Sequence, residues 1–214
     1  FAIQLNPSLV NSIVMPDRGG DSVNSESDLI SLQDEERWLI VPIHFPTTPF
    51  PDSEITSLVE GEDGAIEYIS QASGGRSSLE VTISDRPYIA PQHIGYWGED
   101  ADGSRDVDVQ ELVRMAVSYS LTGTDLSPWD LNSDGIIDRI LFIHGEQPQE
   151  IGGGSQSIWS HFSALDNSIS ISSWSIEHYT ITSTQSGLGT VIHEMLHQMG
   201  CLLYTSPSPR DLAV

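Results

Sequence analysis

Residues 193 to 197 read His-Glu-Met-Leu-His, a pattern that could bind a metal ion and use it. On an α-helix, residues four apart lie on one face about one turn from each other, so His193 and His197 could reach the same ion. Neutral imidazole nitrogens bind zinc at about 2.0–2.1 Å, and a catalytic zinc keeps one position for water. In this motif Glu194 stands beside that water as general base. The alternative is an ordinary helix whose two histidines are satisfied by hydrogen bonds.

The residues around the pair favour a helix on independent grounds. Ile192, Met195, Leu196 and Met199 recur at i, i+3, i+4 and i+7, which is the spacing of an apolar helical face. Gly200 is a natural end for such a helix. We therefore predict one helix beginning near Thr190, with both imidazoles on one side and their nitrogens close enough to share an ion.

A second stretch, residues 130 to 138, has the spacing of a calcium-binding loop. Such loops place oxygen ligands at positions 1, 3, 5 and 9, a glycine at position 6 and a backbone carbonyl at position 7. The candidate ligands are Asp130, Asn132, Asp134, the carbonyl of Ile136, and Asp138. Position 12 departs from the pattern, because it is Leu141 where a bidentate glutamate is usual. The alternative is a turn rich in Asp, Asn and Gly that enters the next strand.

Strands and helices must position these two segments, and the apolar pattern predicts both. Apolar runs predict strands over 38–45, 79–83, 139–144, 168–171 and 176–182, and helical periodicity predicts helices over 64–73 and 106–118. Pro42 lies inside the first strand, which favours an edge or a bulge for it. Asp106 and Asp108 are expected at the N-terminal end of the second helix. This order predicts an α+β or mixed α/β fold.

The composition excludes several kinds of partner. The chain has 214 residues, with 31 acidic and 8 basic ones, a formal net charge of -23 and no lysine. Such a negative field repels phosphate backbones and anionic lipids, so we expect no nucleic acid partner and no membrane insertion. The single cysteine, Cys201, rules out an internal disulfide. The oligomeric state cannot be read from the composition.

The two ends differ from the middle of the chain. Residues 1–36 have little periodicity and are expected to be a leader or linker, and residues 37–200 to be the folded domain. Residues 201–214 break from the preceding composition and are interpreted as a non-native tail. The chain begins without an initiator methionine or an apolar signal core, so any targeting segment is expected to be absent from it.

Together these segments resemble the immune inhibitor A family of secreted microbial metallopeptidases. The matching pieces follow the family's order and cover roughly 38–200. They are the strand at 38–45, the helix ending at Ser73-Gly74, the loop and strand at 129–144, residues 158–161 and the helix at 189–200. The resemblance implies a zincin-like catalytic domain, an extracellular location, and protein or peptide substrates. It also implies that His193 and His197 bind zinc, that Glu194 is the catalytic acid and base, and that the loop at 130–138 binds calcium.

The sequence departs from the family after Gly200. A third, acidic zinc ligand lies further downstream in the family, whereas here Gly200 is followed by Cys201-Leu202-Leu203. A metzincin would need a histidine where Leu203 stands, and Asp211 falls in the suspect tail. We therefore expect two protein ligands, a fold incomplete at its C-terminus and a chain that is itself a poor enzyme.

These patterns favour a zinc-dependent endopeptidase. The competing hypothesis is a non-catalytic calcium-binding surface or adhesion module in which the histidine helix is a relic. The other histidines are expected to be structural, although His161 and His178 precede the zinc helix and could line its cleft. Tyr179 could donate to an oxyanion, but a packed aromatic side chain is the simpler expectation.

Overall fold

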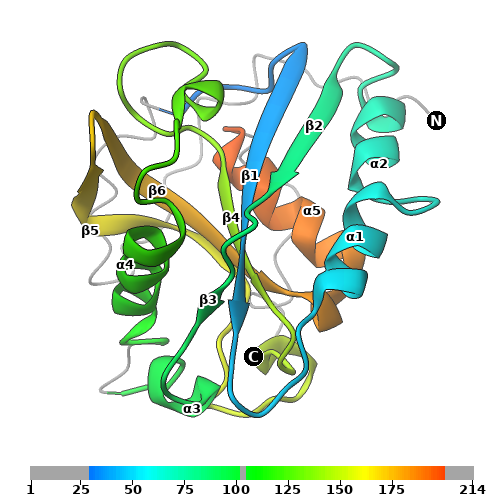
Figure 1. Cartoon of the computed structure of the whole chain (residues 1–214). Helices are drawn as coiled ribbons and strands as arrows, with labels where there is room; N and C mark the ends of the chain where they lie inside the picture. Colours follow the sequence, from blue (N-terminus) through cyan, green and yellow to red (C-terminus); the bar gives the residue numbers. More distant parts are fainter. Residues whose placement is uncertain (1–28, 102–104, 201–214) are drawn as a thin grey trace, which may run out of the picture.

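A mixed sheet with helices on both faces forms the body of the protein. The computed structural model describes residues 29–101 and 105–200 (Figure 1). The strands in this part are β1 (Glu35–His44), β2 (Ser78–Ile83), β3 (Tyr88–Ile89), β4 (Ile140–His144), β5 (His161–Ile171) and β6 (Trp174–Ser183). The α-helices are α1 (Asp52–Glu60), α2 (Ala65–Ala72), α3 (Ile94–Trp97), α4 (Val109–Ser120) and α5 (Gly187–Gln198). Short 3-10 helices are η3 (Ser127–Trp129), η4 (Gln149–Ile151) and η5 (Thr184–Ser186). The prediction of a mixed α/β fold is confirmed.

The sheet is parallel except at one edge. Its strand order is β2-β1-β4-β6-β5, and β3 also pairs with β1. All of these pairs are parallel except that of β5 with β6, which is antiparallel and joined by a tight connection. A parallel sheet buries both faces under helices, so its strands are buried along their whole length, as β4 is.

The expectation of an edge position for the Pro42 strand is wrong, because β1 is central. It pairs with β4 on one side and with β2 and then β3 on the other. On the second side the pairing with β2 ends at Ile40 and the pairing with β3 begins at Ile43. Pro42 lies in this gap, where no neighbouring strand needs the N–H that proline lacks. A proline can therefore occupy a buried central strand here.

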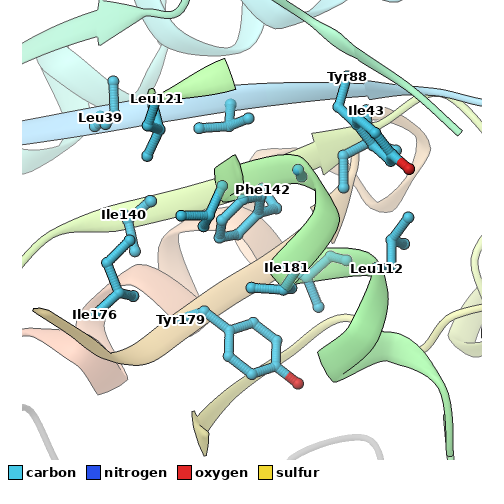
Figure 2. Packing of buried hydrophobic residues seen from close by; sticks show 14 of the residues in the cluster. Leu39, Ile43, Tyr88, Leu112, Leu121, Ile140, Phe142, Ile176, Tyr179 and Ile181 are labelled. Atoms are coloured by element: carbon cyan, nitrogen blue, oxygen red, sulfur yellow. The ribbon is translucent and has the colours of Figure 1, made fainter. Parts of the chain in front are cut away.

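Each face of the sheet has its own apolar core. The face under α4 carries a cluster that includes Leu112, Phe142 and Tyr179, and Figure 2 shows these side chains packed together. The opposite face carries a second cluster, to which α1, α2 and α5 contribute. Figure 1 shows α4 on one side of the sheet and these three helices on the other. The helix with the histidine pair therefore packs on the face away from α4.

Several element boundaries differ from the predictions. Helix α4 begins at Val109, and Asp106 precedes it with a positive φ of 51°. Helix α5 begins at Gly187 rather than near Thr190. Strands β5 and β6 are longer than the predicted runs, and α1 was not predicted. None of the described helices is long and apolar enough to span a membrane.

The expected leader and tail lie mainly outside the described residues. Residues 1–28 and 201–214, with Cys201 and Asp211, are not described. Strand β1 begins at Glu35 and the side chain of Glu36 is fully buried, so residues 35 and 36 of the expected leader belong to the sheet.

Candidate metal centre and active site

Helix α5 positions the candidate zinc residues through its apolar face. Val191, Ile192, Met195 and Met199 are buried in the cluster that also contains residues of β1 and β4. This packing fixes the rotation of the helix about its axis, because its apolar face must meet the sheet. The helix ends at Gln198, and Gly200 has a φ of 69°, the left-handed conformation that favours glycine after a helix. The predicted stop at Gly200 is confirmed.

The two histidines of α5 meet at their Nε2 atoms. His193 Nε2 and His197 Nε2 are 3.1 Å apart, and the ring centroids are 4.7 Å apart. The predicted convergence of the two rings is therefore present, and the same contact is a hydrogen bond between the two imidazoles, as in the alternative of an ordinary helix. Burial lowers the pKa of His193, and burial together with the neighbouring His193 lowers the pKa of His197 to about 4. Both rings are held neutral at physiological pH, which is the form that binds a metal.

This arrangement fits two ligands of a zinc ion. Two nitrogens at about 2.0–2.1 Å from one tetrahedral zinc would lie about 3.3 Å from each other, close to the separation in the structure. Within residues 29–101 and 105–200, however, no group of three or more His, Cys, Asp or Glu side chains is placed to hold a metal. The described part of the chain thus offers a pair of candidate metal ligands and no third one.

The carboxylate of Glu194 is held against the edge strand. The Phe162 backbone N–H, in β5, donates to Glu194 Oε2 at 2.9 Å. Glu194 is only 9% exposed although it lies on the same helix as the histidine pair. A carboxylate with one oxygen bonded to a fixed backbone donor keeps its orientation, as a general base requires. The structure thus brings Glu194 together with His193 and His197.

The side chain of Phe162 links α5 to β6. Its ring stacks on His197 at 6.4 Å and on His178 at 5.8 Å between centroids. His178 therefore lies on the α5 face of the sheet, and the phenyl ring contacts both histidines. Neither spacing nor composition singled out Phe162, since its partners lie on two other elements, α5 and β6, that are distant in sequence.

His161 and Tyr179 bond to each other on the opposite face. His161 Nε2 lies 2.9 Å from the Tyr179 hydroxyl oxygen, and His161 Nδ1 lies 2.7 Å from the Trp159 carbonyl oxygen and 3.8 Å from Asp106 Oδ2. Tyr179 belongs to the core under α4 (Figure 2). Asp106 is buried and accepts from the Trp159 N–H, which explains its place outside the helix. These contacts support the expectation that Tyr179 is a packed aromatic side chain.

The loop at 130–138 gathers its acidic residues around its own backbone. The Asp130 carboxylate accepts from the N–H groups of Asp134 and Gly135, at 3.1 and 3.0 Å. Asn132 donates its amide to Asp134 Oδ2 at 2.7 Å, and Asp138 Oδ2 accepts from the Leu131 N–H at 2.6 Å. Such hydrogen bonds from backbone N–H groups to Asp and Asn side chains are those expected if the loop is a turn.

One carboxyl group of the loop has a perturbed pKa. Burial raises the pKa of Asp138 to about 6, and the carboxylates of Asp134 and Asp130 add to the increase, against the lowering effects of the Leu131 N–H and Arg139. Carboxylates that lie close together repel, and a bound cation would relieve that repulsion. The Ile136 carbonyl remains a candidate ligand, and calcium binding by this loop stays a prediction.

Comparison with known proteins places the chain in one family. Residues 43–203 match the family described as immune inhibitor A peptidase M6, catalytic domain. A curated protein named immune inhibitor A, from Bacillus thuringiensis subsp. alesti, is 26% identical over 170 residues, which cover 63% of this chain and 24% of that protein. The chain thus spans about a quarter of that relative's length. Because the family match covers most of the chain and includes the whole of α5, the chain belongs to the immune inhibitor A peptidase M6 family.

Proposed function

We propose that the chain is the catalytic-domain part of a secreted, zinc-dependent endopeptidase acting on proteins or peptides. The observation that carries the proposal is the 3.1 Å approach of His193 Nε2 to His197 Nε2, with the intervening Glu194 held by the edge strand. Family membership supports a peptidase. It does not favour the alternative of a non-catalytic calcium-binding module.

The proposed reaction divides its tasks among the residues of α5. His193 and His197 would hold the zinc through their neutral Nε2 atoms. Bound zinc would polarise the scissile carbonyl and lower the pKa of a water molecule to about 7. Glu194 would accept a proton from the attacking water and deliver it to the leaving amine nitrogen as the C–N bond breaks. The Phe162 N–H would keep the Glu194 carboxylate in a fixed orientation during both transfers.

The loop at 130–138 is proposed as a calcium site that supports the fold. Asp130, Asn132, Asp134 and Asp138, with the Ile136 carbonyl, would supply the oxygens at about 2.3–2.6 Å from the ion. The loop lies immediately before β4, and the Ile137 N–H and the Ser175 N–H bond it to the start of β6 at 2.8 Å each. An ordered loop at this position would hold two central strands in register.

Zinc binding by the histidine pair tests the proposal most simply. Zinc titrated into the 214-residue chain, followed by competition with a coloured chelator, should saturate near one ion per chain. His193→Ala and His197→Ala should each abolish saturable binding, because a lone histidine is a weak site. His93→Ala is the matched control, since His93 is exposed and far from α5 in sequence. Saturable zinc binding that survives both α5 substitutions, or binding of calcium alone, would contradict the zinc site.

A further inference from the structure

A fully buried ion pair lies at the C-terminal end of the zinc helix. Arg139 Nε donates to Glu36 Oε2 at 2.7 Å and Arg139 Nη2 to Glu36 Oε1 at 3.2 Å, and both side chains are 0% exposed. A buried ion pair is weak evidence for stability, because well-packed apolar side chains can replace it at little cost. The role of this ion pair must therefore be inferred from the other hydrogen bonds of Arg139 and Glu36.

The guanidinium group of Arg139 joins three separate segments. Nη1 donates to the carbonyl oxygen of Gln198, the last residue of α5, at 3.0 Å. Nη1 also donates to the Asp138 carbonyl at 3.2 Å, and Nη2 to the Ile30 carbonyl at 2.8 Å. The carboxylate of Glu36 is fixed in turn, because it accepts from the Gln33 N–H at 2.7 Å.

The end of α5 is tied to the sheet by a second set of bonds. Gln198 Oε1 accepts from the Ile140 N–H of β4 and from the Thr180 hydroxyl of β6, each at 3.3 Å. The last carbonyls of a helix lack intrahelical partners and carry partial negative charge, so a cation is favourable there. Arg139 supplies that cation directly after His197 and one turn after Glu194.

We propose that Arg139, oriented by Glu36, is a positioning residue for the active site. The apolar face of α5 fixes which side of the helix meets the sheet. The guanidinium group of Arg139 fixes the last turn of α5. It thereby fixes the positions of His197 and Glu194 along the helix axis. This inference rests on the proposed zinc peptidase function. It assigns to Arg139 no contact with metal or substrate.

The test uses a variant that removes the pair without leaving a charge behind. Arg139→Ala alone would strand the buried Glu36 carboxylate and could unfold the protein. The double variant Glu36→Leu/Arg139→Met replaces both charges with apolar side chains of similar volume, so a cooperative melt is expected. Arg37→Met is the matched control, because the ion pairs of Arg37 with described residues, 3.1 Å from Glu35 and 3.7 Å from Glu80, are exposed.

Two measurements on these variants are decisive. Loss of a residue that orients a metal ligand lowers metal affinity about 10–100-fold, and we expect that loss of zinc affinity in the double variant. Amide hydrogen exchange without metal should show lost protection in the last turn of α5 and unchanged protection in α4. Arg139→Lys keeps the positive charge but loses the planar guanidinium group. Its protection in the last turn should therefore lie between that of the double variant and that of the wild type. The Arg37→Met control should match the wild type in both measurements.

The outcomes separate this inference from the proposed function. Wild-type affinity for zinc in a folded double variant would overturn the positioning role, whatever the exchange data show. If the wild type binds no zinc at the histidine pair, the proposed function fails, and hydrogen exchange alone decides whether Arg139 holds α5. Equal protection of the last turn of α5 in the wild type and the double variant would then refute the role of Arg139.

Discussion

Burial of His144 should make the protein lose stability as the pH falls. His144 is the last residue of β4, is 1% exposed, and packs edge-on against Phe45 at 5.7 Å between ring centroids. Its Nδ1 accepts from the Glu146 N–H at 3.2 Å, and its Nε2 has no hydrogen-bond partner among the described residues. Burial lowers the pKa of this histidine to about 3. The native state must therefore keep the ring neutral.

The sign and size of the effect follow from proton linkage. Below the unfolded pKa of about 6.5, the unfolded chain binds a proton at His144 that the native state excludes. The free energy of unfolding therefore decreases as the pH is lowered. The loss grows between pH 6.5 and 3 and levels off below that. For folded and unfolded pKa values of about 3 and 6.5, lowering the pH from 7 to 5 costs about 2 kcal/mol.

A neutral replacement isolates this contribution from the many carboxylates. His144→Asn places an amide oxygen near the position of Nδ1, so it can still accept from the Glu146 N–H, and it does not titrate. Urea unfolding at pH 7, 6 and 5 should show the wild type losing about 2 kcal/mol more than this variant. His93→Asn, at an exposed position, should follow the wild-type curve. Parallel curves for the wild type and His144→Asn would show that burial of His144 does not control the acid response.

Two further predictions concern α5 and the acidic loop. Met195→Ala should lower the free energy of unfolding by about 2–5 kcal/mol in urea titrations, because Met195 is 1% exposed between α5 and the sheet. Val107→Ala, at an exposed position, should change it by less than about 0.5 kcal/mol. Calcium at about 100 times its dissociation constant should stabilise the wild type by about 2.7 kcal/mol and raise its Tm. The same calcium concentration should leave the Tm of Asp130→Ala unchanged. An equal rise of the Tm in both proteins would favour the turn hypothesis.

Local patterns in the sequence predicted the elements whose packing is also local. The apolar runs of β1, β2 and β4 and the periodicity of α2 located these elements to within a few residues. The i, i+4 spacing placed His193 beside His197 because a single helix sets that distance. The predicted edge position of β1 was wrong. The gap between its neighbours β2 and β3, which accommodates Pro42, leaves no signal in the sequence of β1 itself.

Contacts between distant segments could not be predicted in this way. Glu36 and Arg139 are 103 residues apart, and Phe162 and Glu194 are 32 apart. A single arginine at the start of an apolar strand does not reveal its partner. The one available signal was the presence of charged residues at the ends of two buried strands, which marks a pair only after the strands are known to be neighbours.

Glu194→Gln tests the central claim most directly. Bound zinc and hydrolysis of an unfolded protein substrate would be measured on the same samples of the wild type and the variant, both in a native-length version of the protein, with the exposed Glu60→Gln as control. The account predicts that the variant keeps its zinc and loses turnover by a factor of about 10²–10⁴, because only the proton acceptor is removed. Turnover equal to that of the wild type, or loss of the zinc together with the activity, would contradict the role of Glu194 as general base.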